Sequence, residues 1–220
     1  MPIAAVLWDM DGLLVDSEPL WTRAEIDLAA ELGGAWSDQL KAAIAGTRLD
    51  VSVPAILEHY GHPTDHETVA WASRFLVDRM VGLYAENPPL LDGVTDLLAA
   101  VADAGVPQAL VSSSYRLLVD AVLAHGYGPF ALSLSGDEVT HGKPHPEPYL
   151  TAAARLGVEP RDCVVLEDSA AGVLAGEAAG CAVVAVPSVP GVSVLETART
   201  AVRTSLAEVD LALLRELVSR

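Results

Sequence analysis

Apolar residues 3–8 form the first clear hydrophobic segment of the chain, and two carboxylates, Asp9 and Asp11, follow it. Gly12 comes next and permits a backbone turn. A short apolar run bounded by a turn signal predicts a buried strand. If the extended backbone continues past residue 8, the side chains of Asp9 and Asp11 point to the same side. We therefore expect a pair of carboxylates at the C-terminal end of this strand.

Apolar residues then recur at helical spacing from residue 17 to residue 89, with Gly or Pro residues between the segments. Ser17 is expected to cap the first helix, and Pro88 and Pro89 to end the last one. The predicted helices cover residues 17–32, 37–45, 50–60 and 65–85. Four helices joined by short connections predict a small bundle.

From residue 90 onward the pattern changes to short apolar runs that alternate with helical segments. Strands are predicted at 108–111, 130–134, 163–166 and 182–186, and helices at 94–104, 114–125, 147–156, 170–179 and 207–218. Such alternation predicts a parallel sheet with helices on both faces. The strand at residues 3–8 belongs to this sheet. The fold class is therefore α/β, with a helical bundle inserted after the first strand as a cap.

The composition supports a well-packed and acidic protein. Of the 220 residues 51% are hydrophobic, and the formal charge is −17. This is enough apolar material for a sizeable core, and it argues against disorder. The negative charge argues against a nucleic-acid partner or an anionic membrane, because phosphates would be repelled. An anionic substrate would need local cations that outweigh the overall field.

Both cysteines, Cys163 and Cys181, adjoin apolar runs, which favours buried thiols in a reducing cytosol. The chain enters its first strand without a basic leader, so no signal peptide is expected. The long uncharged segment 180–195 contains Pro187 and Pro190 and does not match a membrane span. We expect a monomer in the cytoplasm.

Polar clusters follow three of the predicted strands, at Asp9-x-Asp11, Ser112-Ser113-Ser114 and Glu167-Asp168-Ser169. The carboxyl ends of parallel strands share one rim, and ligands bind there in open α/β sheets. Acidic side chains that face one another across this rim would repel strongly, and a divalent cation would offset that repulsion. Mg²⁺ prefers a few carboxylate oxygens together with water. The sequence therefore predicts a magnesium site at the rim.

Ser112 and Lys143 are candidates for binding an anion. Ser112 lies between a strand and a helix, so it is either a helix cap or part of an anion site built from a hydroxyl and free N–H groups. Lys143 lies in a loop with Pro144, Pro146 and Pro148. A lysine in a loop is commonly solvated, but prolines stiffen this loop and favour a fixed ammonium group. Such a group would balance a phosphate or the acidic cluster.

Four segments match, in order, the motifs of the haloacid dehalogenase (HAD) superfamily: Asp9-Met10-Asp11-Gly12, Ser112, Lys143-Pro144 and Glu167-Asp168-Ser169-Ala170-Ala171-Gly172. The chain resembles the branch that contains β-phosphoglucomutase and the sugar-phosphate phosphatases. Its segment 9–21 is especially similar to the 2-deoxyglucose-6-phosphatases, also described as hexitol phosphatases. The resemblance implies a Rossmann-like core, residues 1–16 and 90–220, with an inserted all-helical cap, residues 17–89.

The resemblance also implies a role for each motif residue. Asp9 would be the nucleophile that forms an aspartyl-phosphate, and Asp11 would protonate the leaving alcohol and then activate water. Ser112, Ser113 and Lys143 would hold the phosphoryl oxygens.

The metal implied by the resemblance is Mg²⁺. Its ligands would be Asp9, the backbone carbonyl of Asp11 and Asp168, with Glu167 as a further ligand or as a partner behind them. The implied activity is Mg²⁺-dependent hydrolysis of a small phosphorylated metabolite, with sugar or sugar-alcohol phosphates as the expected substrates.

In the predicted cap, Gly46-Thr47-Arg48 resembles a Gly-Ser-Arg element that reaches the substrate in related enzymes, so Arg48 is a candidate substrate-binding residue. The alternative is an exposed turn between helices. Three histidines, His59, His62 and His66, stand close together in the sequence. Gly61 and Pro63 interrupt any helix there, so we expect solvated loop histidines and not a metal site.

Four other activities are alternatives to a phosphatase. A serine hydrolase needs a Gly-x-Ser-x-Gly elbow, which the segment around Ser112 lacks. A haloacid dehalogenase proper lacks the equivalent of Asp11, and a response-regulator domain lacks an inserted helical cap. A β-phosphoglucomutase carries a histidine where Trp21 stands here, so phosphoryl transfer between sugar positions is the less favoured reaction.

Overall fold

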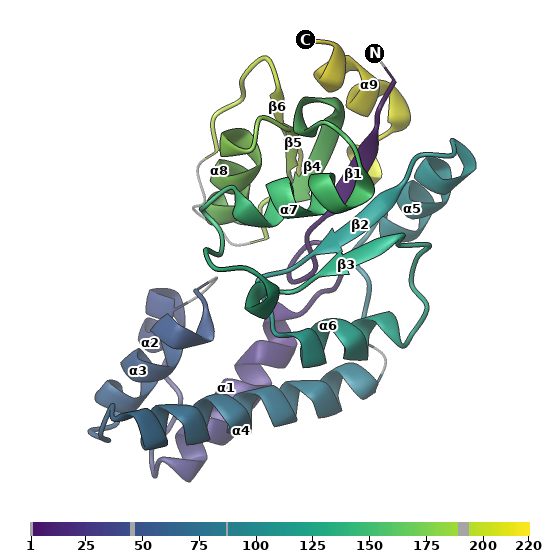
Figure 1. The fold of residues 1–220 in the computed structure, drawn as a ribbon. Helices are drawn as coiled ribbons and strands as arrows, with labels where there is room; N and C mark the ends of the chain where they lie inside the picture. The colour runs from purple at the N-terminus through teal and green to yellow at the C-terminus, as the bar shows by residue number, and fades with distance from the viewer. Residues whose placement is uncertain (1, 45–46, 87, 189–193) are drawn as a thin grey trace. The chain divides into compact units, whose positions relative to one another are not determined.

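The computed structural model describes residues 2–44, 47–86, 88–188 and 194–220 (Figure 1). The chain divides into two compact units. The larger unit comprises Met1–Asp16 and Pro89–Arg220, and the smaller comprises Ser17–Pro88. Among the described residues, no helix combines the length and the apolar character needed to cross a bilayer.

The described part of the larger unit contains a six-stranded sheet in the order β3-β2-β1-β4-β5-β6, and all neighbouring strands pair in parallel. The strands are β1 (Ala5–Trp8), β2 (Gln108–Val111), β3 (Leu132–Leu134), β4 (Cys163–Glu167), β5 (Ala182–Ala185) and β6 (Thr200–Val202). β1 is fully buried between β2 and β4, which explains why its sequence is a continuous apolar run.

Helices cover both faces of this sheet. They are α5 (Val94–Asp103), α6 (Arg116–Leu123), α7 (Glu147–Leu156), α8 (Ala170–Ala178) and α9 (Leu211–Ser219), with short 3₁₀ turns η1 (Gly136–Glu138), η2 (Pro160–Asp162) and η3 (Leu206–Glu208). On one face, alternate strand residues such as Leu7 and Val165 pack with Tyr149 of α7 and Val173 of α8. On the other face, Trp8 Nε1 donates to Gln108 Oε1 (2.9 Å), and Gln108 Nε2 donates to the Leu98 carbonyl of α5.

The smaller unit is a helical bundle of α1 (Glu18–Glu31), α2 (Asp38–Ile44), α3 (Leu49–His59) and α4 (His66–Ala85). Helix α4 packs against α1 and α3, and buried apolar residues such as Leu28, Ile56 and Leu76 form the core of the bundle. Asp65 caps α4, because its carboxylate accepts hydrogen bonds from the N–H groups of Glu67 and Thr68.

The α/β fold predicted from the sequence is confirmed, and several boundaries were wrong. Strand β6 was not predicted, and β3 begins at residue 132 rather than 130. The last helix begins at Leu211, not at residue 207, because Asp210 accepts a hydrogen bond from the N–H of Leu213 and caps it there. Residues 206–208 form the separate turn η3.

Two predicted features of helix starts were also wrong. Helix α6 begins at Arg116 rather than at residue 114. Ser17 precedes α1 with helical backbone angles and makes no side-chain cap bond, and its buried hydroxyl has no partner among the described residues. Ala45, the expected end of the second helix, and Gly46 lie outside the described residues.

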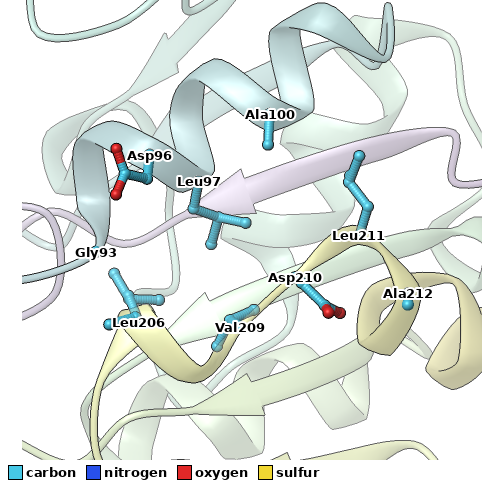
Figure 2. Close-up of a pocket in the computed structure, with 10 residues that line it drawn as sticks. Gly93, Asp96, Leu97, Ala100, Leu206, Val209, Asp210, Leu211 and Ala212 are labelled. Carbon is cyan, nitrogen blue, oxygen red and sulfur yellow. The ribbon is translucent and has the colours of Figure 1, made fainter.

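A pocket of about 440 Å³ lies beside α5 and the segment from η3 to the start of α9 (Figure 2). Its lining is largely apolar, and Asp96 and Asp210 are its acidic residues. Asp210 already caps α9, and none of the candidate site residues lines this pocket.

Candidate active site

The site forms where β1, β2 and β4 end side by side. Asp9 directly follows β1, Ser112 directly follows β2, and Glu167 is the last residue of β4. The register pairs Trp8 with Leu166, and Asp9 N donates to the Leu166 carbonyl at 3.0 Å. The parallel register therefore brings residues that are more than 100 positions apart to one rim, as the sequence predicts.

Lys143 is the centre of the buried charges at this rim. Its Nζ lies 2.5 Å from Asp9 Oδ1, 2.6 Å from Glu167 Oε1 and 2.9 Å from the Val111 carbonyl. The Lys143 side chain is only 4% exposed. A buried ammonium group is stable only when paired, and here two carboxylates and a carbonyl satisfy its three donors. The loop lysine is therefore a fixed counter-charge and not a solvated one.

Glu167 is fully buried, and hydrogen bonds occupy its carboxylate. Oε1 accepts from Lys143 Nζ and from the Tyr149 hydroxyl (2.7 Å), while Oε2 accepts from Asp168 N, Ser169 N and Ser169 Oγ. Gly172 lies directly against this carboxylate, and a Cβ atom at position 172 would overlap it. These contacts fit a residue that holds Lys143 in place better than one that offers free oxygens to a metal.

Asp168 lies at the start of the loop that follows β4 and is 9% exposed. Its Oδ2 accepts a short hydrogen bond from Ser188 Oγ (2.5 Å). Gly12, with a φ of 80°, approaches so closely that a Cβ there would overlap Asp168 Oδ2. A left-handed backbone and the lack of a side chain at position 12 are therefore both required for the turn after Asp9.

Asp11 faces the serines that follow β2. Its Oδ2 accepts a hydrogen bond from Ser114 Oγ at 2.8 Å, and Ser112 Oγ lies 3.4 Å away. Ser112 Oγ in turn accepts from Ser114 N at 2.9 Å. Because α6 begins only at Arg116, Ser112 is not its N-cap. The hydroxyls of Ser112 and Ser114 instead orient the Asp11 carboxylate.

The electrostatics of the site fit a divalent cation. Asp9, Glu167 and Asp168 place carboxylate oxygens within 4.8 Å of one another, and all three residues are buried. Burial, with the neighbouring negative charges, raises the pKa of Asp9 well above its usual value and that of Asp168 to about 7. Burial disfavours the charge of Lys143, but Asp9 and Glu167 outweigh it and hold the pKa of Lys143 above its usual value.

The same pairing decides the state of Glu167. Burial acts to raise the pKa of its carboxyl, but Lys143 and the hydrogen-bond donors outweigh this and lower it. Lys143 and Glu167 therefore compensate each other. The three carboxyl groups of Asp9, Glu167 and Asp168 outnumber the single positive charge of Lys143, and oxygen donors of this kind suit Mg²⁺. The residues present thus fit the predicted magnesium site, with Asp9 and Asp168 as its best-placed carboxylates.

Two residues of this rim, Tyr149 and Ser188, were not predicted from the sequence, and Ser114 was expected at the rim but without a role. Ser114 stands in the serine run after β2, so its position was a usable signal. Tyr149 is fully buried on α7 at a position that the helical pattern assigns to the core. Nothing in the local sequence indicates that its hydroxyl reaches Glu167. Ser188 likewise has no neighbouring motif that would single it out.

The remaining residues that the sequence analysis singled out are Ser113, Arg48 and the three histidines. Ser113 is exposed in the loop before α6, and its backbone packs closely against Gly136. In the helical unit, Arg48 precedes α3, and its side chain is 34% exposed and pairs with Asp50 (3.3 Å). His59 and His66 are exposed, whereas a ring nitrogen of His62 lies 3.0 Å from the Leu32 carbonyl.

Comparisons with known proteins agree with these features. The family description of haloacid dehalogenase-like hydrolases matches residues 3–180. Hexitol phosphatase B of Escherichia coli K12 is 36% identical over 224 residues, which cover 99% of this chain and 96% of that protein. A fructose-1-phosphate phosphatase of the same organism is 31% identical, covering 80% of this chain and 93% of its own length.

The fold also matches solved structures. CbbY from Rhodobacter sphaeroides, in complex with phosphate, superposes with a TM-score of 0.85 at 28% identity, and the match covers 97% of this chain and 99% of CbbY. A β-phosphoglucomutase from Clostridium difficile matches with a TM-score of 0.79 at 23% identity, covering 99% and 97% of the two chains. At that identity the second match supports the fold alone.

Proposed function

Because the chain belongs to the haloacid dehalogenase-like hydrolase family, as its four motifs predict, we propose that it hydrolyses sugar or sugar-alcohol phosphates through a covalent intermediate on Asp9. A phosphoric monoester hydrolase is the activity that the family and its phosphatase relatives support. The observation that carries the finer proposal is the buried contact between Asp9 and Lys143 at the end of β1.

In the proposed reaction, an oxygen of Asp9 attacks the phosphorus while the bond from phosphorus to the alcohol oxygen breaks. Asp11 gives its proton to that leaving oxygen. Asp11, now a carboxylate, then takes a proton from water as the water oxygen attacks the phosphorus. The Asp9 carboxylate leaves, inorganic phosphate is released, and both aspartates return to their starting states.

Three groups are proposed to bind and orient the phosphoryl group. Lys143 lies beside Asp9, so its positive charge reduces the repulsion between the Asp9 carboxylate and the negatively charged phosphoryl oxygens. Ser112 and Ser113 follow β2 and offer hydroxyl groups for the remaining oxygens, whereas the Ser112 N–H already donates to the Leu134 carbonyl at 2.9 Å. The hydroxyl of Ser114 holds Asp11 at the same rim. A strongly acidic protein thus binds an anion through a locally compensated site.

Magnesium is proposed as the cofactor, with Asp9, the Asp11 carbonyl and Asp168 as its ligands and Glu167 as a partner behind them. When bound, Mg²⁺ supplies a positive charge that lowers the repulsion between the phosphate and Asp9. Gly12 and Ser188 hold Asp168 in position for this role.

The helical unit, Ser17–Pro88, is proposed to act as the substrate cap that was expected at residues 17–89, and Arg48 as a residue that recognises the substrate. The support for Arg48 is the similarity of Gly46-Thr47-Arg48 to a Gly-Ser-Arg element and the partial exposure of its guanidinium group. An arginine recognises phosphate or clustered hydroxyls through several parallel donors.

The nucleophile is tested with Asp9→Asn, which is nearly isosteric but a poor nucleophile. Turnover of p-nitrophenyl phosphate is expected to vanish while the circular dichroism spectrum stays unchanged. Acid-quenched wild-type enzyme should carry a hydroxylamine-sensitive phosphate label from ³²P-labelled substrate, and the variant should not. A loss of activity smaller than about tenfold, about 1.4 kcal/mol in barrier, would refute the assignment.

Hydrolysis is favoured over mutase chemistry by Trp21. A mutase must protect its aspartyl-phosphate until a sugar hydroxyl arrives, and β-phosphoglucomutase uses a histidine at the corresponding position. An indole has only a donor and cannot relay that proton. We expect phosphate release from hexose 6-phosphates and negligible conversion of β-glucose 1-phosphate to glucose 6-phosphate, even with the bisphosphate primer. Isomerisation that outruns phosphate release would make the chain a mutase.

A further inference from the structure

We propose that His141, His145 and Glu147 form a binding site for a transition-metal cation of the zinc class, separate from the carboxylate site of Asp9 and Asp168. All three residues lie in the loop between η1 and α7 or at the start of α7. The proposal does not depend on the phosphatase reaction, because it concerns other ligands and another class of metal.

The three side chains already lie close to the spacing that such a metal needs. The potential ligand atoms lie within 4.8 Å of one another. His141 Nδ1 is 2.9 Å, and His145 Nδ1 is 4.0 Å, from Glu147 Oε2. Two ligands bound at about 2.1 Å in tetrahedral geometry are about 3.4 Å apart. The observed distances lie on either side of this value, so small side-chain rotations bring all three atoms into place.

The donor set selects the class of metal. Two imidazoles and one carboxylate suit zinc, nickel, copper or cobalt, whereas Mg²⁺ and Ca²⁺ prefer oxygen donors alone. Three protein ligands leave the fourth tetrahedral position to water. The Glu147 N–H donates to His145 Nδ1 at 3.2 Å, and the 2.9 Å contact of His141 Nδ1 with the Glu147 carboxylate needs a proton on that nitrogen, so a bound metal would replace both hydrogen bonds. An unprotonated imidazole nitrogen is the form that binds a metal.

The surrounding structure holds the site in place and leaves it accessible. The Glu147 carboxylate accepts from Thr140 N (2.8 Å) and His141 N (2.9 Å), so its position is fixed. The two imidazole rings lie with their centroids 4.6 Å apart. The side chains of His141 and His145 are 62% and 51% exposed, so an ion can enter from solvent. The net charge of −17 raises the local concentration of cations.

The position of this site has a structural consequence, because His141 and His145 flank Lys143. A metal bound to both would connect the two ends of the segment that places the Lys143 ammonium between Asp9 and Glu167. The N–H groups of the non-proline residues from 140 to 147 should therefore exchange with deuterium more slowly when the metal is bound.

The test is calorimetric titration of the protein with Zn²⁺ at saturating Mg²⁺, which occupies the carboxylate site. Wild type is expected to bind one Zn²⁺ per chain, and His145→Ala and His141→Ala to bind at least about tenfold more weakly. Co²⁺ bound at this site should give the visible absorption bands that are typical of low-symmetry coordination, and both variants should lose these bands. His66→Ala, which removes an exposed histidine of the helical unit, is the matched control and should bind like wild type.

Two outcomes would overturn the proposal. Zn²⁺ binding that His145→Ala retains and Asp168→Asn abolishes would place the ion at the carboxylate site. Equal affinity of wild type and both loop variants would remove the histidines from any metal site. Because His141 and His145 are exposed, both variants should keep the wild-type melting temperature without metal, so a loss of binding cannot be ascribed to unfolding.

Discussion

Replacement of Gly172 by Ala should destabilise the protein, although the same change stabilises most helices. Gly172 lies in the first turn of α8, where Ala is usually better than Gly by about 0.5–1 kcal/mol. Here a Cβ atom would overlap the carboxylate of the fully buried Glu167. Neither group has room to move freely, because α8 packs against β4 and β5.

The size of the effect follows from the contacts of Glu167. Its carboxylate accepts from Lys143, Tyr149, Asp168 N and two donors of Ser169. A hydrogen bond to a charged group contributes about 1.5–3 kcal/mol. If two of these hydrogen bonds are lost and the gain in helix propensity is subtracted, the net destabilisation is roughly 2–5 kcal/mol. Displacement of Glu167 also removes a partner of Lys143, so turnover should fall as well.

Urea and thermal unfolding of Gly172→Ala, with Gly82→Ala as the matched control, test this reasoning. Gly82 is an exposed glycine inside α4, with open space where a Cβ would lie. Gly82→Ala should raise the free energy of unfolding by up to about 1 kcal/mol. For Gly172→Ala we expect a lower melting temperature, at about 2–4 °C per kcal/mol. If both variants gained stability and Gly172→Ala kept wild-type turnover, the contact between Gly172 and Glu167 would not constrain the site.

Four further predictions concern the metal, the helical unit, an ion-pair cluster and the thiols. Exhaustive chelation should abolish turnover and Mg²⁺ restore it, while Ca²⁺ should inhibit through its looser coordination; full activity in EDTA would contradict the cofactor assignment. Arg48→Ala should reduce kcat/KM for sugar phosphates more than for p-nitrophenyl phosphate, and an equal loss on both would remove Arg48 from substrate recognition. Burial opposes the charge of Glu138, but hydrogen bonds from Ser135, Arg116 and Arg155 outweigh it and lower its pKa to about 2. Because this pKa is lowered by folding, ionised Glu138 stabilises the fold above its unfolded-state pKa of about 4.3, and this stabilisation is lost as pH falls toward 2. Glu138→Gln should therefore lower the melting temperature at pH 7, but progressively less below pH 4.3. Burial raises the pKa of the Cys163 and Cys181 thiols to about 12, so native protein at pH 8 should react with Ellman's reagent only after unfolding, and rapid labelling of the folded protein would show that these thiols are accessible.

Local patterns in the sequence were enough to predict the fold class and the main candidate residues. The apolar run before Asp9 has the composition of a strand buried on both faces, and β1 lies at the middle of the sheet. Residues Ser112 and Glu167 were expected at the rim because each follows or ends an apolar run, and parallel strands end together. Such features depend on near neighbours in the chain, which the sequence displays directly.

Weak or competing local signals explain the wrong boundaries. Strand β6 has three residues, too few for a period-2 pattern, and it is recognised only by its pairing with β5. Ser17 has the residue type of a cap, but its backbone is helical, so its hydroxyl is not placed to accept the expected bond. Residues 207–210 have acceptable helix propensity, and the cap formed by Asp210 decided that α9 begins after them.

What the sequence determined by itself is therefore an α/β chain with an acidic rim, a buried first strand and a lysine near the acids. Only the tertiary structure decided that Lys143 contacts Asp9 and Glu167 together, that Tyr149 donates to Glu167, and that Gly172 makes room for that carboxylate. The physical reason is that periodicity reports which side of an element is buried, whereas a hydrogen bond depends on distances of a few tenths of an ångström between segments up to 134 residues apart.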